Sequence, residues 1–252
     1  MGVTKTDYMR GMQCPKMLWL DKHKPEEKVI PPEVQERLDE GNRFGDSAMG
    51  MFGAFVETTT YRDDGRLDYA AMIAKTNECI HNGTPVICEA AFRYYGNYCA
   101  VDILKKVDGG YELYEVKNCG TVEDQFVKDV GFQRYIVTRS GIRLKKCFIV
   151  YHGPDENNPF MIEDVSKKAK EYSETINDNI WRLGKIKNQD EEVIVEPGKQ
   201  CSTGIMATAI NKERDKWQTK KATRISVLRN KFGMRPVSFG DTSPQPITER
   251  LS

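Results

Sequence analysis

Two carboxylates and a lysine stand near the middle of the sequence, on either side of a turn. Asp102 follows the apolar Val101, and Glu115-Val116-Lys117 follows a glycine-containing turn at Asp108-Gly109-Gly110. Apolar and β-branched residues flank this turn on both sides, which indicates an antiparallel β-hairpin. Because side chains alternate between the faces of a strand, Glu115 and Lys117 must share a face.

The position of the turn decides which residue lies opposite Asp102. A two-residue loop at Asp108-Gly109 places Glu115 opposite it. A loop at Gly109-Gly110 places Lys117 there instead. In either register the three charged side chains share one face, with opposed Cβ atoms about 5 Å apart. We therefore predict that Asp102, Glu115 and Lys117 converge in one cleft.

Two carboxylates beside a lysine are suited to metal-assisted hydrolysis. Mg²⁺ is usually held by one or two carboxylates, while water and substrate phosphate fill its other positions. The lysine could then orient or help deprotonate a water molecule. The alternative is a solvated hairpin face with one cross-strand salt bridge. A third acidic residue, Glu89, stands in the preceding apolar run. It could be another carboxylate near the metal, or an edge-strand or rim residue facing solvent.

These residues resemble the core of the PD-(D/E)XK nucleases, in which Asp102 and Glu115-Val116-Lys117 occupy successive strands and Gln133 lies on the next helix. The stretch from Gln13 to Leu20, Gln-Cys-Pro-Lys-Met-Leu-Trp-Leu, resembles the start of bacterial RecB-like and Cas4-like exonucleases. Residues 40–45 resemble the next motif of that group. The likeness covers roughly residues 4–201 as an ordered series of short motifs.

The resemblance implies a restriction-endonuclease-like fold and a DNA exonuclease of repair, recombination or defence, dependent on Mg²⁺ or Mn²⁺. It also implies which residues form the site. The metal ligands would be Asp102, Glu115, the Val116 carbonyl and Glu89. Lys117 and Gln133 would complete the catalytic set, and Arg43 and Tyr135 would contact DNA. Tyr135 is displaced from the family's usual Gln-x-x-x-Tyr spacing, and Gly45 stands where a family histidine is common. The alternative is a catalytically inactive nucleic-acid-binding remnant of the same fold.

Cysteine usage limits the further cofactors. Related proteins often hold an iron–sulfur cluster with one early and three late cysteines, so the resemblance implies that Cys14 and Cys201 approach each other. Cysteine is absent after Cys201, and four-thiolate ligation in that arrangement is therefore not expected. Seven scattered cysteines without a C-x-x-C pair do not form a disulfide framework, and they fit a reducing cytoplasm.

Composition and length suit one good-sized domain with an appendage. The chain has 252 residues, of which 39% are hydrophobic and 30% charged. Its formal net charge of +1 hides an asymmetry, because residues 203–252 contain 10 Lys and Arg against 4 Asp and Glu. We therefore expect a nuclease-like domain over residues 1–201 and a basic, partly helical or poorly ordered tail over 202–252. The sequence contains no run of 18 apolar residues, so it predicts no membrane-spanning helix.

The patterns along the chain predict an α/β fold with a mixed sheet and helices on both faces. Thr6 is expected to cap a first helix, and Pro15 to begin the second. Apolar and small residues from Val34 to Phe52 mark a long helix, in which Gly41 and Gly45 would allow either close packing on the sheet or approach of DNA. Strands are expected at 85–94, 98–107, 111–117 and 146–151, and further helices at 67–80, around 126–137, and at 162–183.

Overall fold

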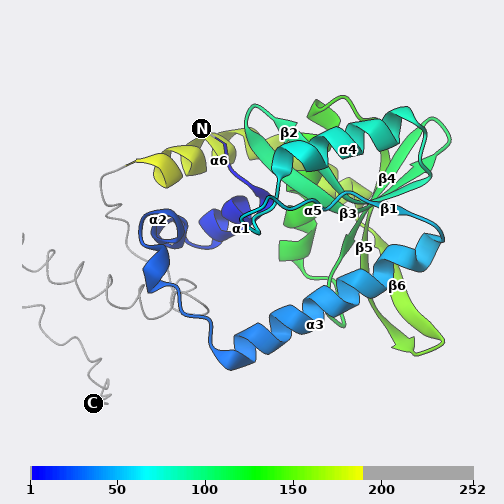
Figure 1. Cartoon of the computed structure of the whole chain (residues 1–252), viewed down its shortest axis with the longest axis horizontal. Helices are drawn as coiled ribbons and strands as arrows, with labels where there is room; N and C mark the ends of the chain where they lie inside the picture. The colour runs from blue at the N-terminus through cyan, green and yellow to red at the C-terminus, as the bar shows by residue number, and fades with distance from the viewer. Residues whose placement is uncertain (1, 190–252) are drawn as a thin grey trace, which may run out of the picture. The chain divides into compact units, whose positions relative to one another are not determined.

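A mixed β-sheet lies at the centre of the protein, in a computed structural model that describes residues 2–189 (Figure 1). Within those residues the sheet has six strands in the order β1-β2-β3-β4-β5-β6. The pairs β1–β2 and β4–β5 are parallel and the other three are antiparallel. The strands are β1 (Val56–Glu57), β2 (Val86–Tyr94), β3 (Asn97–Val107), β4 (Gly110–Val116), β5 (Leu144–Asp155) and β6 (Asn158–Asp164).

Helices cover both faces of this sheet, as the sequence predicts for a restriction-endonuclease-like α/β fold. The helical segments of the described part are α1 (Lys5–Gln13), α2 (Pro15–His23), α3 (Pro32–Met49), α4 (Tyr69–His81), α5 (Asp124–Arg139) and α6 (Ser166–Asn188), with short 3₁₀ turns η1 (Pro25–Glu27) and η2 (Gly50–Phe52). Helices α1, α5 and α6 share the main apolar core with the sheet. The end of α3 and η2 pack on the other face.

The main core packs α5 against the sheet, chiefly on β5, β2 and β3. Residues Val130, Phe132, Ile136 and Val137 of α5 are fully buried, together with Leu113 of β4. Gly131 lets α6 approach closely, because a Cβ there would lie 2.8 Å from the Cβ of Tyr172. Consequently α5 is held between sheet and α6, and its polar residues that face the sheet are held equally firmly.

Helix α1 begins at Lys5 because Thr4 and Asp7 form a capping box. The Thr4 side chain accepts a hydrogen bond from the Asp7 backbone N–H, and the Asp7 carboxylate accepts one from the Thr4 N–H. The predicted cap at Thr6 is therefore wrong by two residues. The preceding segment is joined to β3, since the Tyr98 N–H donates to the Val3 carbonyl at 3.1 Å and the Val3 N–H to Asn97 Oδ1 at 3.0 Å.

Two other expectations need correction. The predicted helix at 162–183 begins at Ser166, because Asn158–Asp164 forms β6 and pairs with β5. Asp164 ends the strand and accepts hydrogen bonds from the backbone and hydroxyl of Ser166. The apolar Phe160-Met161-Ile162 run therefore belongs to a strand, which its aromatic and β-branched residues favour.

Helix α3 is long but has little contact with the sheet. Ala48 is its one buried residue, and Leu38 is 45% exposed. A Cβ added at Gly41 or Gly45 would meet no atom within 4 Å. The predicted close packing of these glycines on the sheet is therefore wrong, and their side of the helix faces open space.

Residues 190–252 lie outside the described part of the chain, so the predicted tail boundary at 201/202 and the approach of Cys14 to Cys201 remain predictions. Cys14 itself is buried at the start of α2, which begins at Pro15 as predicted. None of the helices in residues 2–189 is both long enough and apolar enough to cross a membrane.

The open surroundings of Gly41 and Gly45 give a first prediction. Replacing either residue by alanine should raise the free energy of unfolding by about 0.5–1 kcal/mol, because alanine favours the helix and meets no neighbour. Gly131→Ala in α5 is the matched control and should destabilise the protein, because its Cβ would collide with Tyr172. Urea unfolding measures all three; a loss of stability at Gly41 and Gly45 would show that α3 packs more tightly than described.

Candidate active site

The β3–β4 hairpin sets the positions of the central carboxylates. Val107 pairs with Gly110 across an Asp108-Gly109 turn, which is the first of the two registers considered above. The pairs run as far as Ile103 with Tyr114, and the same register extended by one residue places Asp102 opposite Glu115. Instead of a main-chain bond at this point, Asp102 Oδ2 accepts a hydrogen bond from the Val116 N–H at 2.7 Å.

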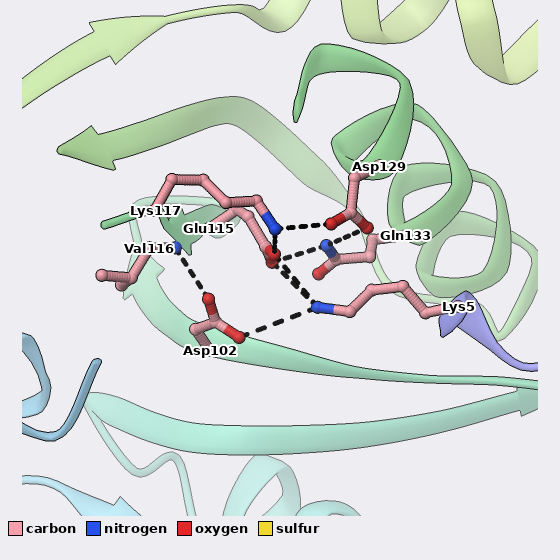
Figure 2. A network of polar contacts seen from close by, with 7 residues as sticks. All are labelled: Lys5, Asp102, Glu115, Val116, Lys117, Asp129 and Gln133. Atoms are coloured by element: carbon pink, nitrogen blue, oxygen red, sulfur yellow. Dashed lines mark hydrogen bonds and ion pairs between the residues drawn. The ribbon is translucent and has the colours of Figure 1, made fainter. Parts of the chain in front are cut away.

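Glu115 is the hub of a buried polar cluster (Figure 2). Its Oε1 accepts from Lys117 Nζ at 2.5 Å and from Lys5 Nζ at 3.0 Å. Its Oε2 accepts from Gln133 Nε2 at 2.6 Å and from Lys5 Nζ at 3.2 Å. Because the Glu115 side chain is 2% exposed, these donors replace the water that a carboxylate would otherwise require.

Asp129 of α5 links the remaining members of the cluster. It accepts from Lys117 Nζ at 2.7 Å and from Gln133 Nε2 at 3.2 Å. Asp129 and Gln133 are four residues apart, so they lie on the same side of α5. This spacing is the signal that could have revealed Asp129, which the strand motifs do not include. The Gln133 Oε1 atom is buried and has no hydrogen-bond partner among the described residues.

Lys5 is the second member that the motif pattern does not assign. Its Nζ lies between Glu115 and Asp102, at 3.9 Å from Asp102 Oδ1 (Figure 2). It arrives as the first residue of α1, after the chain has been joined to β3. A sequence pattern offers no signal for this contact, because Lys5 is 110 residues from Glu115.

Glu89 lies in β2, across from Asp102, where the regular pairing is interrupted. Cys88 pairs with Ile103 and Ala90 with Val101, whereas Glu89 has φ of 53°. This left-handed conformation is uncommon for a residue other than glycine and is found preferentially at functional sites.

The irregular conformation at Glu89 also breaks the regular alternation of β2, which would place Ala90 on the same face as Val86 and Cys88. Ala90 shares the main core with Ile87, instead of the other face with Val86 and Cys88. Moreover, β2 lies between β1 and β3, so Glu89 is not on an edge strand.

A cavity of about 670 Å³ opens in front of these carboxylates. Its walls include Lys5, Glu89, Asp102 and Glu115 on the sheet side, and Gly41 and Gly45 of α3 on the other. The two glycines therefore face the same space as the acidic residues. Such a concave site with convergent polar groups is the form expected of a binding or active site.

Burial and mutual repulsion separate the acidities of the carboxyl groups. Burial, and secondarily the nearby Glu115, raise the pKa of Asp102 to about 8. Burial likewise raises the pKa of Glu89 to about 7, and that of Asp129 above its ordinary value. For Glu115 burial acts in the same direction, but Lys117 and Lys5 outweigh it and hold the pKa well below normal. Glu115 is therefore the carboxylate that stays ionised.

Lys117 remains protonated at neutral pH. Burial by itself would lower its pKa, but the carboxylates of Glu115 and Asp129 raise the pKa above the ordinary value. A permanently charged ammonium donates hydrogen bonds and attracts anions. In this arrangement Lys117 cannot serve as the general base that the sequence pattern allowed.

The oxygen donors at this position fit Mg²⁺ or Mn²⁺ in type. Asp102 Oδ1 and the Glu115 carboxylate face a common space, and Val116 borders the same cavity. Within residues 2–189, no group of three or more His, Cys, Asp or Glu side chains is arranged to hold a metal, so two carboxylates and the Val116 carbonyl would have to be completed by water and phosphate. The orphan Gln133 Oε1 would suit a water donor. The fit requires that Lys5 Nζ leave the space between the carboxylates.

Two further predicted residues do not join the cluster. Tyr135 is on α5, but its hydroxyl donates to Asn177 Oδ1 and its ring packs against Tyr94. Arg43 is exposed on α3 and is not among the residues that line the cavity. Their expected roles in DNA contact therefore remain predictions without support from this geometry.

Several solved structures are similar to this chain at low sequence identity. SSO0001 has a TM-score of 0.38 and 10% identity, over 77% of this chain and 79% of its own. LHK-Exo, an alkaline exonuclease from Laribacter hongkongensis, has a TM-score of 0.25 and 14% identity over 44% and 67%. The same exonuclease in complex with dAMP gives 0.32 and 12% over 74% and 91%. No protein-family model and no curated protein matches the sequence.

The raised pKa of Asp102 gives a second prediction. In the folded protein Asp102 keeps its proton up to about pH 8, whereas its ordinary pKa is 3.8. The protonated Asp102 therefore contributes fully to the free energy of unfolding below about pH 4, and this contribution is lost as the pH rises through 8. Without divalent ions, Asp102→Asn should therefore gain stability relative to wild type between about pH 5 and pH 9, by about 1–2 kcal/mol.

Urea unfolding of both proteins in EDTA checks this expectation. Asp108→Asn, the same substitution in the exposed turn of the same hairpin, is the matched control and should show no such trend. A pH-independent difference between wild type and Asp102→Asn would mean that Asp102 is ionised throughout this range.

Proposed function

We propose that this protein is a divalent-metal-dependent nuclease that hydrolyses phosphodiester bonds of DNA. The observation that carries the proposal is the juxtaposition of Asp102, Glu115 and Lys117 on the sheet wall of an open cavity. The three residue types are those that metal-assisted phosphate hydrolysis requires: two anionic oxygen ligands and one fixed cation. Preference for DNA ends is an extension of this proposal and rests on the motifs of residues 4–45.

Each residue of the cluster has a role that follows from its contacts. Asp102 and Glu115 would hold the ion, with the Val116 carbonyl and Glu89 as further oxygen donors. A bound divalent ion supplies charge stabilisation to the phosphate and makes hydroxide available near neutral pH. Gln133 fixes Glu115 through its amide nitrogen and keeps its Oε1 available to accept a hydrogen bond from a water molecule.

Lys117 would stabilise the negative charge that develops on the phosphate. Asp129 is a positioning residue, because it holds the Lys117 ammonium together with Glu115. A preorganised cation of this kind does not have to be oriented at the moment of reaction. Gly41 and Gly45 leave two positions of the α3 wall without side chains, which suits the close approach of a nucleic-acid backbone there.

The cytoplasm is the compartment we propose for this activity. Residues Cys79, Cys88, Cys99, Cys119 and Cys147 are free thiols. Four of these five are buried in the domain that contains the cavity. Unpaired thiols in such number suit a reducing environment.

The direct test of the proposal is cleavage of DNA in the presence of Mn²⁺. Wild type should degrade end-labelled linear DNA in Mn²⁺ but not in EDTA, and Asp102→Asn should be inactive because the second anionic ligand is lost. Asp108→Asn controls for the substitution itself and should cut normally. Covalently closed circular DNA should survive if ends are required. Binding of DNA without cleavage by wild type would favour the inactive remnant instead.

Lys117 separates charge stabilisation from metal binding. Lys117→Gln should reduce the cleavage rate by about a hundredfold or more, because a fixed charge stabiliser is removed. Its Mn²⁺ affinity, measured by calorimetry, should be unchanged or higher, because a cation near the ion has been removed. Lys105→Gln, on the adjoining strand and outside the cluster, is the control. Equal cleavage by wild type and Lys117→Gln would exclude this hairpin as the nuclease site.

A further inference from the structure

The ammonium of Lys5 occupies the space between the two principal carboxylates. Its Nζ is 3.0 and 3.2 Å from the two oxygens of Glu115 and 3.9 Å from Asp102 Oδ1. Figure 2 shows this nitrogen lying between the two acidic groups. Within residues 2–189, all ion pairs of Lys5 are made with Asp102 and Glu115.

The two lysines of the cluster differ in what anchors them. Lys117 has a second anionic partner in Asp129, which does not face the space between Asp102 and Glu115 (Figure 2). If Glu115 bound a cation, Lys117 would therefore keep a counter-ion. Lys5 would lose both of its direct ion pairs, because these partners are the residues that the cation would take, and would keep only the longer-range attraction of Asp129.

Lys5 can leave its position without a change in the backbone. The chain around it is fixed by the capping box of Thr4 with Asp7 and by the hydrogen bonds of Val3 to β3. The lysine side chain, by contrast, is a flexible four-carbon stem whose head is a strongly hydrated point charge. The side chain is 25% exposed and borders the cavity, so its ammonium can move out into that cavity.

We propose that Lys5 is an exchangeable counter-ion of the metal site. When no divalent ion is bound it neutralises Glu115 and lies beside Asp102, and the arriving ion displaces it into the cavity. A dication and an ammonium between the same two carboxylates repel each other, and the site therefore holds one or the other. This inference rests on the metal site of the proposed function, and it concerns binding of the ion rather than hydrolysis.

The displacement can be measured on the wild-type protein by reductive methylation of lysine amines, read by mass spectrometry of peptides. In EDTA, Lys5 should be protected by its two carboxylate partners. In saturating Mn²⁺ it should be modified several-fold faster, because losing its ion pairs lowers the pKa of the ammonium and exposes the amine. Lys117 should remain protected through Asp129. Lys187, which pairs with Asp7 and is similarly buried, should be unaffected by the ion.

Removal of the charge provides an independent measurement. Lys5→Met keeps most of the apolar stem, and by calorimetry it should bind Mn²⁺ at least about tenfold tighter than wild type, because no ammonium has to be expelled. Lys187→Met is the matched control, with no expected change. A purely structural role for Lys5 would produce the opposite result, since a damaged site binds the ion more weakly.

The outcomes separate this inference from the proposed nuclease function. Tighter Mn²⁺ binding by Lys5→Met with Mn²⁺-dependent exposure of Lys5 supports exchange, even if neither protein cuts DNA. Unchanged or weaker binding, or Lys5 still protected in saturating Mn²⁺, overturns it, even if wild type is an active nuclease. Absence of Mn²⁺ binding by both proteins also overturns it.

Discussion

The buried carboxylate of Glu115 is the interaction on which the rest of the site depends. An isolated carboxylate with so little contact with water would be strongly disfavoured, and it persists because cationic and amide donors surround it. These donors come from α1, from the residue that follows β4 and from α5, so one charge links three elements that also share the main apolar core. Lys5, Lys117 and Gln133 thus all compensate the buried negative charge of Glu115.

Local chemistry explains why much of the fold can be predicted from the sequence. Turn residues at 108–110 and the alternation around them restrict the hairpin to registers that share one polar face, and the observed register is one of these. Pro15 begins α2 because proline has a fixed φ that suits a helix and lacks an N–H that the first turn would leave unpaired. Such features depend on residues that are close together in the sequence, so they can be predicted from the sequence alone.

The features that could not be predicted depend on partners far along the chain. The contact of Lys5 with Glu115 has no local signal, and neither does the left-handed conformation of Glu89 within β2. For α3, glycine spacing alone does not distinguish close packing from an open surface, because both use the absence of a side chain. The start of α6 was misplaced for a related reason: an apolar run of three residues suits a strand as well as a helix.

The separation of 110 residues between Lys5 and Glu115 also affects how the domain can assemble. Contacts between distant parts of a chain form slowly, since a long loop must close before they contribute. During synthesis the segment that becomes α1 emerges early and must wait for β4 and α5 before its lysine finds a partner. The acidic cluster is therefore complete only in a fully folded domain, so a partly folded chain lacks the assembled site.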